Sequence, residues 1–159
     1  VLGRAAAVAA PAGLVIWLLA NITVGEVSLL HHIGHFLDPL GRMMGLDGYI
    51  LLAFVFGFPA NEIVLPIAMM CYTGAGVMTE AGSTAELLGI FSANGWTAMT
   101  AVCFIAFSLV HFPCSTTCLT IHKESGSLKW TALAFLLPTL LGILLCSGIA
   151  AVWRLVGAL

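Results

Sequence analysis

Two Phe-Pro sequences interrupt long apolar segments, and each is followed by polar side chains that can bind a cation. The prolines are Pro59 and Pro113. Proline has no amide hydrogen and clashes with the carbonyl group four residues earlier, so a helix ends or kinks there. The polar residues that follow are Asn61 and Glu62 at the first break, and Cys114 and Ser115 at the second. Each break therefore leaves backbone carbonyl oxygens beside side chains that can act as ligands.

Glu62 is a carboxylate within an apolar segment. A charge at the centre of a membrane-spanning helix costs about 2.5–3.5 kcal/mol on insertion scales, so such a residue faces a partner or a water-filled path. In one interpretation Glu62 is a cation ligand or proton carrier, with Asn61 beside it. In the other, its carboxylate accepts hydrogen bonds from the first amide groups of the helix that begins at Pro59. The cost of placing the charge in a membrane favours the first interpretation.

His111 and Cys114 are the soft ligands near the second break. Thiolate or imidazole together with carbonyl oxygen suits Fe²⁺, Zn²⁺, Cu⁺ or Co²⁺ better than Na⁺ or Ca²⁺. Cys118 lies on the same helical stripe and is a weaker candidate. The alternative for each cysteine is a small packing residue in a membrane helix. These residue types alone do not distinguish iron from zinc or manganese.

The composition places these residues in a membrane protein. Of the 159 residues, 61% are hydrophobic and 8% are charged, and the mean hydropathy is +1.12. An ordinary soluble domain has about 25% charged residues. A net charge of −2 with five Lys and Arg supplies no basic surface for nucleic acid. Soluble enzymes and nucleic-acid binders are therefore excluded, and without a phosphate-loop or hydrolase motif there is no catalytic residue to propose.

The hydropathy pattern predicts an all-α, polytopic bundle of about four spans in a single membrane domain, residues 1–159. A span needs about 20 mostly apolar residues. Two segments are uncharged throughout, Ala5–Gly25 and Trp130–Trp153. Two more, at about 48–73 and 96–122, contain the prolines and predict broken helices. The chain begins with Val rather than Met, so we expect it to be a piece of a longer protein.

Residues 26–47 predict an amphipathic helix at the membrane interface, bent near Pro39, because their apolar residues recur at helical spacing. His31, His35 and Asp38 share one face of this helix. That face is either a metal-binding face or the wet side of an interfacial helix, and we favour the second.

The positions of Lys and Arg predict the orientation. With four crossings, Arg42 lies on the same side as Lys123 and Lys129, and both ends of the chain lie on the other side. The 122–129 loop contains both lysines, whereas the 74–95 connector is acidic and has neither Lys nor Arg. We therefore expect 122–129 inside and 74–95 outside.

Five short sequences form a recognisable series. They are Leu-Asp-Pro-Leu-Gly-Arg (37–42), Gly-Leu-Asp-Gly (45–48), Gly-Phe-Pro-Ala-Asn-Glu (57–62), Phe-Pro-Cys-Ser-Thr-Thr (112–117) and Lys-Glu-Ser-Gly-Ser-Leu-Lys-Trp (123–130). In this order they resemble the carboxy-terminal membrane region of the bacterial ferrous iron transport protein B family. The resemblance covers approximately residues 38–130. Its specific parts are Pro-Cys-Ser-Thr-Thr and Lys-Glu-Ser-Gly-Ser.

The resemblance implies a multi-pass importer of Fe²⁺ in the bacterial inner membrane. The family has an amino-terminal cytoplasmic GTP-binding domain and two gate segments of the nucleoside-recognition type. This chain would contain the second gate, at about 46–146, with Cys114 as the gate cysteine and Glu62 as the acidic residue of the preceding broken helix. Fe²⁺ would be the cargo rather than a bound cofactor, and GTP would bind only to the missing domain.

The expected partners are bilayer lipid, the other domains of the parent transporter and a second copy of the chain, with no nucleic acid. Two alternative functions stay open. One is an ion-coupled permease of the nucleoside type, and the other is a structural membrane subunit without transport activity.

Overall fold

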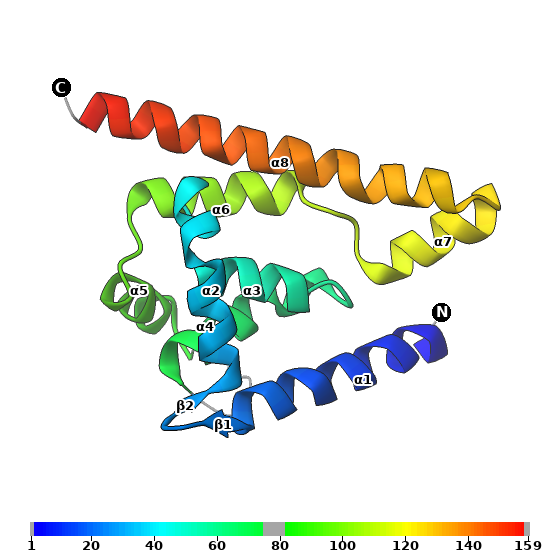
Figure 1. The fold of residues 1–159 in the computed structure, drawn as a ribbon, viewed down its shortest axis with the longest axis horizontal. Helices are drawn as coiled ribbons and strands as arrows, with labels where there is room; N and C mark the ends of the chain where they lie inside the picture. The colour runs from blue at the N-terminus through cyan, green and yellow to red at the C-terminus, as the bar shows by residue number, and fades with distance from the viewer. Residues whose placement is uncertain (1, 75–81, 158–159) are drawn as a thin grey trace.

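The computed structural model describes residues 2–74 and 82–157, and nearly all of them are helical (Figure 1). The predicted all-α bundle is confirmed. A two-residue antiparallel hairpin is the one pair of strands in the part described. The elements in chain order are α1 (Leu2–Asn21), β1 (Thr23–Val24), β2 (Val27–Ser28), α2 (Leu29–Met43), α3 (Gly48–Phe56), η1 (Asn61–Ile63), α4 (Val64–Thr73), α5 (Thr84–Ala93), α6 (Ala98–Val110), α7 (Ser115–Ser125) and α8 (Leu128–Gly157).

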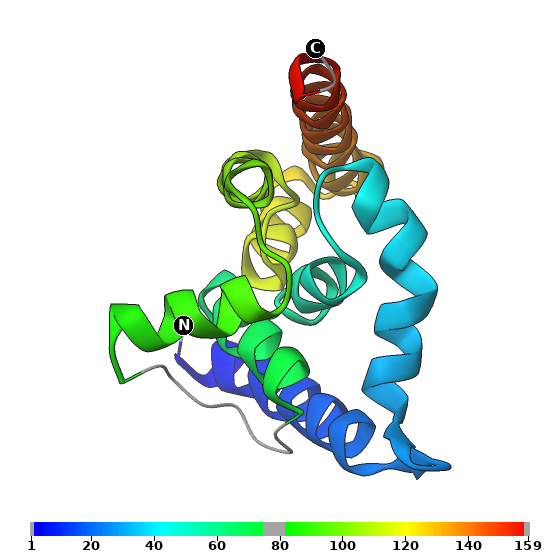
Figure 2. The same cartoon turned by 90° about the vertical axis from the view of Figure 1, so that its left-hand side faces the viewer.

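The longest apolar helices lie at the carboxy-terminal end of the chain. Ala98–Ser125, which comprises α6 and α7, and Leu128–Gly157 are each long and apolar enough to cross a membrane. A third candidate exists if the pair of α2 and α3, bent by 108°, is one span. Helices α6 and α8 run side by side (Figures 1 and 2). The predicted helix at Trp130–Trp153 is confirmed, and α1 is a single helix over most of the first predicted span.

Helices α3 and α4 fold back on each other, so the 48–73 segment does not run from one side of the bundle to the other. Tyr72, near the end of α4, donates a hydrogen bond to Oδ2 of Asp47, which caps the start of α3. The tip of this helical hairpin is the Pro59 break. Gly57 makes the reversal possible, because a Cβ atom there would collide with the Val64 side chain.

This fold-back corrects the predicted crossing. The segment is long and apolar enough to span, but α3 ends at Phe56, three residues before Pro59, and the chain reverses instead of continuing. Two helices of 9 and 10 residues are each too short to cross a bilayer of about 30 Å. The 48–73 segment therefore has the form of a re-entrant hairpin.

Helix α2 is the amphipathic helix predicted over residues 26–47, and Pro39 lies within it. It runs across the direction of α6 and α8 in both views (Figures 1 and 2). Glycines allow its close crossing with α3. A Cβ atom on Gly48 would collide with the carbonyl oxygen of Gly34, and one on Gly41 would collide with the backbone of Asp47.

The prediction that Arg42 lies on the same side as Lys123 and Lys129 is wrong. A guanidinium nitrogen of Arg154, near the end of α8, donates a hydrogen bond to the carbonyl oxygen of Arg42. Arg42 therefore lies at the end of the bundle opposite to Lys123 and Lys129, which flank the α7–α8 turn. The start of α1 lies at the latter end, near α7 (Figure 1), so the two ends of the chain do not share a side. Both errors arise from counting the 48–73 hairpin as a crossing.

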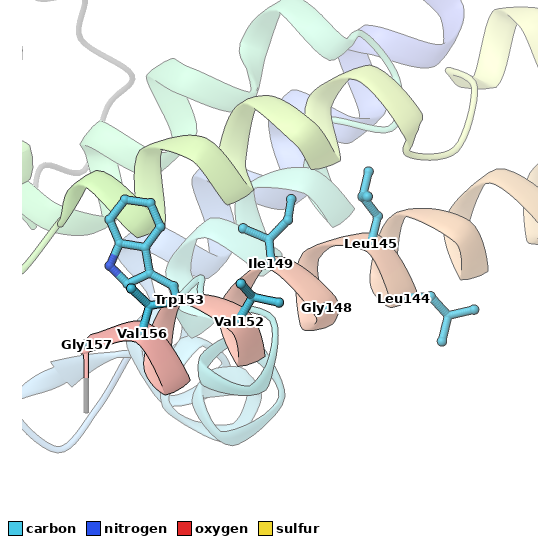
Figure 3. A pocket seen from close by; sticks show the side chains of 8 residues that line it. All are labelled: Leu144, Leu145, Gly148, Ile149, Val152, Trp153, Val156 and Gly157. Carbon is cyan, nitrogen blue, oxygen red and sulfur yellow. The ribbon is translucent and has the colours of Figure 1, made fainter. Parts of the chain in front are cut away.

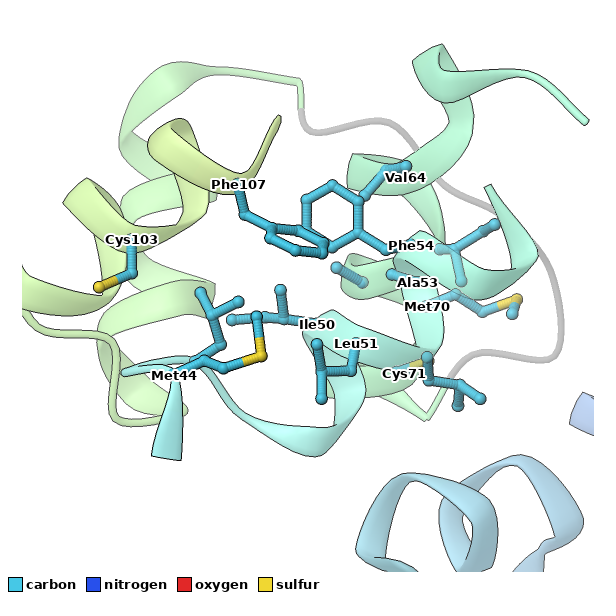
Figure 4. Packing of buried hydrophobic residues seen from close by; sticks show 14 of the residues in the cluster. Met44, Ile50, Leu51, Ala53, Phe54, Val64, Met70, Cys71, Cys103 and Phe107 are labelled. Atoms are coloured by element: carbon cyan, nitrogen blue, oxygen red, sulfur yellow. The ribbon is translucent and has the colours of Figure 1, made fainter. Parts of the chain in front are cut away.

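The centre of the core is α3, which is buried on nearly all sides. Ile50 and Ala53 have no exposed surface, and Phe54 contacts Phe107 of α6 edge to face at 4.8 Å (Figure 4). A helix that is apolar all round belongs at the middle of a bundle. By contrast, α8 has many exposed leucines, and one open apolar hollow of about 770 Å³ lies along its last four turns, from Leu144 to Gly157 (Figure 3).

Candidate functional site

The two proline breaks meet in the structure through Ser115. The backbone N–H of Ser115 donates to the carbonyl oxygen of Phe58 at 2.8 Å, and its hydroxyl donates to the carbonyl oxygen of Pro59 at 3.4 Å. Ser115 is the first residue of α7 and is only 6% exposed. The tip of the α3–α4 hairpin is therefore bonded directly to the broken span α6–α7.

Aromatic rings surround this junction. Phe58 and Phe112, which precede the two prolines, contact each other at 5.8 Å between ring centroids. Phe135 of α8 contacts both, at 5.7 Å from Phe58 and 4.9 Å from Phe112. The matching Phe-Pro pairs thus form one apolar cluster, and α8 closes one side of it.

Glu62 lies outside this cluster, three residues beyond Pro59. Its side chain is exposed and lines an open hollow of about 540 Å³, together with residues of α4 and the start of α5. It has no hydrogen bond or ion pair with any residue in 2–74 or 82–157. The turn at the tip is held by backbone bonds instead, including Ala60 N–H to Gly57 O at 3.0 Å and Ile63 N–H to Ala60 O at 3.1 Å. The capping contact considered as an alternative for Glu62 is not seen, and Asn61 beside it is also exposed.

Cys114 is the residue immediately before α7 and is partly exposed. Its Sγ lies 3.2 Å from Oγ1 of Thr117, one turn into the helix. Cys118 donates to the carbonyl oxygen of Pro113 at 3.5 Å. Both thiols of the predicted stripe are therefore close to the second break.

His111 is the last residue before that break, and its ring is enclosed by aromatic side chains. Its centroid lies 5.0 Å from Phe54 and 5.1 Å from Phe112. Nδ1 contacts the carbonyl oxygen of Ser108 at 2.9 Å, whereas the buried Nε2 has no partner among the described residues. If Nδ1 carries the proton, Nε2 presents a free lone pair, which is the form of imidazole that binds metals.

The candidate ligands do not form a closed metal site. Within residues 2–74 and 82–157, no group of three or more His, Cys, Asp or Glu side chains could hold a metal ion. Glu62, His111 and Cys114 are thus not gathered around one point. The junction places single polar side chains beside the backbone carbonyl groups of Phe58 and Pro59.

The amino-acid sequence is similar to sequences of known proteins. The Gate family, described as nucleoside recognition, matches residues 2–128. The chain belongs to the Gate family. The Fe(2+) transporter FeoB of Staphylococcus aureus (strain MSSA476) is 33% identical over 132 residues, which are 78% of this chain and 18% of that protein. The FeoB of Campylobacter jejuni is 27% identical over 139 residues, or 79% of this chain and 22% of that protein.

These matches confirm the predicted relationship to the membrane region of the ferrous iron transport protein B family. The FeoB of Methanocaldococcus jannaschii is 35% identical over 102 residues, or 64% of this chain and 14% of that protein. This Gate chain spans about a fifth of the length of the curated relatives it matches. No solved structure matches it.

A second junction in the Gate chain was not predicted. Trp96 Nε1 donates to the Tyr72 hydroxyl at 2.8 Å, and that hydroxyl donates to Asp47. Asp47 caps α3 by accepting from Ile50 N–H at 2.8 Å. Trp96 lies two residues before α6, so this chain of bonds joins the starts of α3 and α6, the two helices that end at the proline breaks. An acidic residue before an apolar helix signals the cap, but nothing local in the sequence signals Tyr72.

The polar face of α2 makes structural contacts. Asp38 accepts from Arg42 Nε at 2.6 Å and from the N–H of Gly48 at 3.2 Å. Nδ1 of His31 lies 2.5 Å from the hydroxyl of Tyr49. Asp38 thus links α2 to the start of α3, and the side chains of His31 and His35 are exposed.

Proposed function

We propose that this Gate chain forms part of the pathway by which a larger protein moves Fe²⁺ across the bacterial inner membrane. The observation on which the proposal rests is the meeting of the two proline breaks at Ser115, inside a bundle with helices long enough to cross. Irregular backbone at membrane depth is tolerated where it is buried in protein or lines a cavity. The names of its relatives favour ferrous iron as the cargo. They also point to a transporter segment rather than to a catalytic domain.

In this proposal Glu62 and Cys114 are transient ligands on either side of the junction. Carbonyl oxygens at Phe58 and Pro59, with Asn61 and Ser115 nearby, supply the remaining oxygen ligands. His111 contributes its unpaired Nε2 at the end of α6. Carboxylate and carbonyl oxygens combined with a thiolate or an imidazole fit a borderline-soft divalent ion. Nucleotide hydrolysis would belong to a GTP-binding domain elsewhere in the parent protein.

Two other functions are weighed against this one. The description of the Gate family favours a permease of the nucleoside type, which would take up labelled nucleoside rather than metal. A structural subunit would lose assembly, not flux, when His31, His35 or Asp38 is changed. Asp38 contacts Arg42 and Gly48, so its replacement affects the structure whether the chain transports or only assembles. The quantity that decides between the functions is therefore the flux through correctly assembled protein.

Anaerobic uptake of radiolabelled Fe²⁺ by cells that express the full-length parent tests the proposal. Cys114→Ala and Glu62→Gln are each expected to reduce uptake at least tenfold at equal membrane abundance, and excess Zn²⁺ and Mn²⁺ serve as competitors. Cys146→Ala and Glu86→Gln are the matched controls, because the Cys146 thiol donates to the carbonyl oxygen of Cys103 in α6 and the Glu86 carboxylate accepts from Gly82 N–H before α5. Retained iron uptake in both test variants would refute the assignment of these residues.

A further inference from the structure

We propose that Ser115 is a latch: its two hydrogen bonds hold the proline breaks together in a closed state, and an ion passes only when α7 withdraws from the hairpin tip. The inference rests on the proposed function and adds the position and the moving part of the gate. Ser115 has a positioning role in this inference, because it acts on the ion only through the carbonyl groups of Phe58 and Pro59.

The latch occupies the oxygens that a cation at the tip would need. A non-helical turn exposes the carbonyl groups of Phe58 and Pro59, and these are the oxygen ligands nearest to the second break. In the structure both accept from Ser115, at 2.8 Å and 3.4 Å. A donor N–H and a cation compete for the same negative end of a carbonyl dipole, so strong ligation there requires Ser115 to leave.

The charge distribution at the junction also opposes a cation. Cys114 is the N-cap of α7 and Ser115 is its first residue, so the amino terminus of this helix points at the hairpin tip. A helix amino terminus has the effect of about half a positive charge. A divalent cation bound to the Phe58 carbonyl in this conformation would lie against that charge. The described state is therefore one that excludes the ion from the tip.

Helix α7 is the element able to move. Ser115 is its one buried residue in the part of the chain described, whereas six of the nine residues of α3 are buried. Residues 111–114 connect α7 to α6 without helical structure, and Gly126, at φ 61°, ends α7 before α8. Elements with few buried contacts open at the lowest cost. The latch thus joins a fixed hairpin to a mobile helix.

Ser115→Pro removes the latch selectively. Proline is favoured at the first position of a helix, where the missing N–H has no intrahelical partner. The preceding residue, Cys114, is at φ −63° and ψ 162°, which is the region a residue before proline adopts. The substitution therefore spares α7 but removes both donors to the hairpin tip. Ala98→Pro is the matched control, since Ala98 is exposed and is the first residue of α6 after an extended Thr97.

The test measures Fe²⁺ entry into vesicles that contain the full-length parent, under an inward iron gradient, without oxygen or added nucleotide. A dye quenched by Fe²⁺ reports the initial rate. Ser115→Pro is expected to leak at least ten times faster than the wild type, and Ser115→Ala, which keeps the N–H, about threefold faster. Ala98→Pro is expected to stay within twofold of the wild type. Iron uptake by cells that express the wild type is measured in parallel.

Each outcome decides between the two proposals. Faster leakage in Ser115→Pro and Ser115→Ala, without leakage in Ala98→Pro, supports the latch. A wild-type rate in Ser115→Pro, or equal leakage in Ala98→Pro, overturns it even when wild-type cells take up iron. If Ser115→Pro is not monodisperse, a wild-type rate in Ser115→Ala overturns the latch. Wild-type cells that take up no iron overturn the proposed function, and the latch with it.

Discussion

Tyr72 joins helices that are distant in the sequence. Its hydroxyl both donates to Asp47 and accepts from Trp96 Nε1, and its ring contacts Tyr49 and Phe91. The Asp47 carboxylate thus accepts from Tyr72 through Oδ2, and from Ile50 N–H at the start of α3 through Oδ1. Removal of one partner from such a network leaves the others without their hydrogen bonds.

Tyr72→Phe is expected to destabilise the folded protein by about 1.5–3 kcal/mol, because hydrogen bonds to charged groups contribute that much and the ring contacts are kept. Thermal unfolding of the purified full-length protein in detergent measures the change. Tyr49→Phe is the control: its hydroxyl contacts the exposed His31, so its loss is expected to cost less than about 1 kcal/mol. Equal losses of stability would show that the Asp47–Tyr72–Trp96 chain has no special role.

At the scale of the elements, three glycines determine how α2 crosses α3. Gly34, Gly41 and Gly48 lie where the two backbones come so close that a Cβ atom on Gly41 or Gly48 would collide with main-chain atoms. Backbone, unlike the end of a flexible side chain, cannot move aside without shifting a whole helix. The crossing sets the position of α3 and therefore of the hairpin tip.

Gly48→Ala is expected to destabilise the protein by about 1–3 kcal/mol or more through overpacking, and to reduce its yield in the membrane. The control is Gly89→Ala in α5, where a Cβ atom meets nothing within 4 Å. That change is expected to be neutral or to stabilise by up to about 1 kcal/mol, as alanine favours helix more than glycine does. Chemical or thermal unfolding of both variants in the same detergent compares them. Similar stabilities would contradict the close crossing.

Local chemistry explains which elements were predictable. The ends of α3 and α6, and the helix at 128–157, follow from proline stereochemistry and hydropathy, which act over a few residues. The fold-back of 48–73 does not, because a crossing helix and a re-entrant hairpin have the same apolar composition. Tertiary contacts, such as that of Tyr72 with Asp47, 25 residues apart, distinguish them. Ser115 was a candidate from its position beside Pro113, but its partner, the hairpin tip, required the tertiary structure.

At the scale of the whole molecule, the fold-back changes the arrangement of the connectors. Arg42 and Arg154 lie together at one end of the bundle, and the 122–129 loop lies at the other. The β1–β2 hairpin precedes α2 and lies at the first of these ends (Figure 1). Glu26, in the turn of this hairpin, and Ser125, at the end of α7, are both exposed and mark the two ends.

Glu26→Cys and Ser125→Cys are expected to react with a membrane-impermeant maleimide from opposite sides. The 122–129 loop is predicted inside, so Ser125→Cys should label only in opened cells or inverted vesicles, and Glu26→Cys in intact cells. The parent without either substitution measures the background from its native cysteines. Labelling of both positions from the same side would restore the four-crossing arrangement and contradict the hairpin.

The bond between Phe58 and Ser115 also sets an order of events during synthesis of the chain. The hairpin tip is made 57 residues (115 − 58) before the residue that satisfies its carbonyl groups. At about 5–20 residues per second, the ribosome needs about 3–11 s to supply that partner. During this interval a polar tip cannot settle among lipid tails, so α3 and α4 must wait at the bilayer surface or against the insertion machinery. The hairpin tip can thus be satisfied only after Ser115, at the start of α7, has been made.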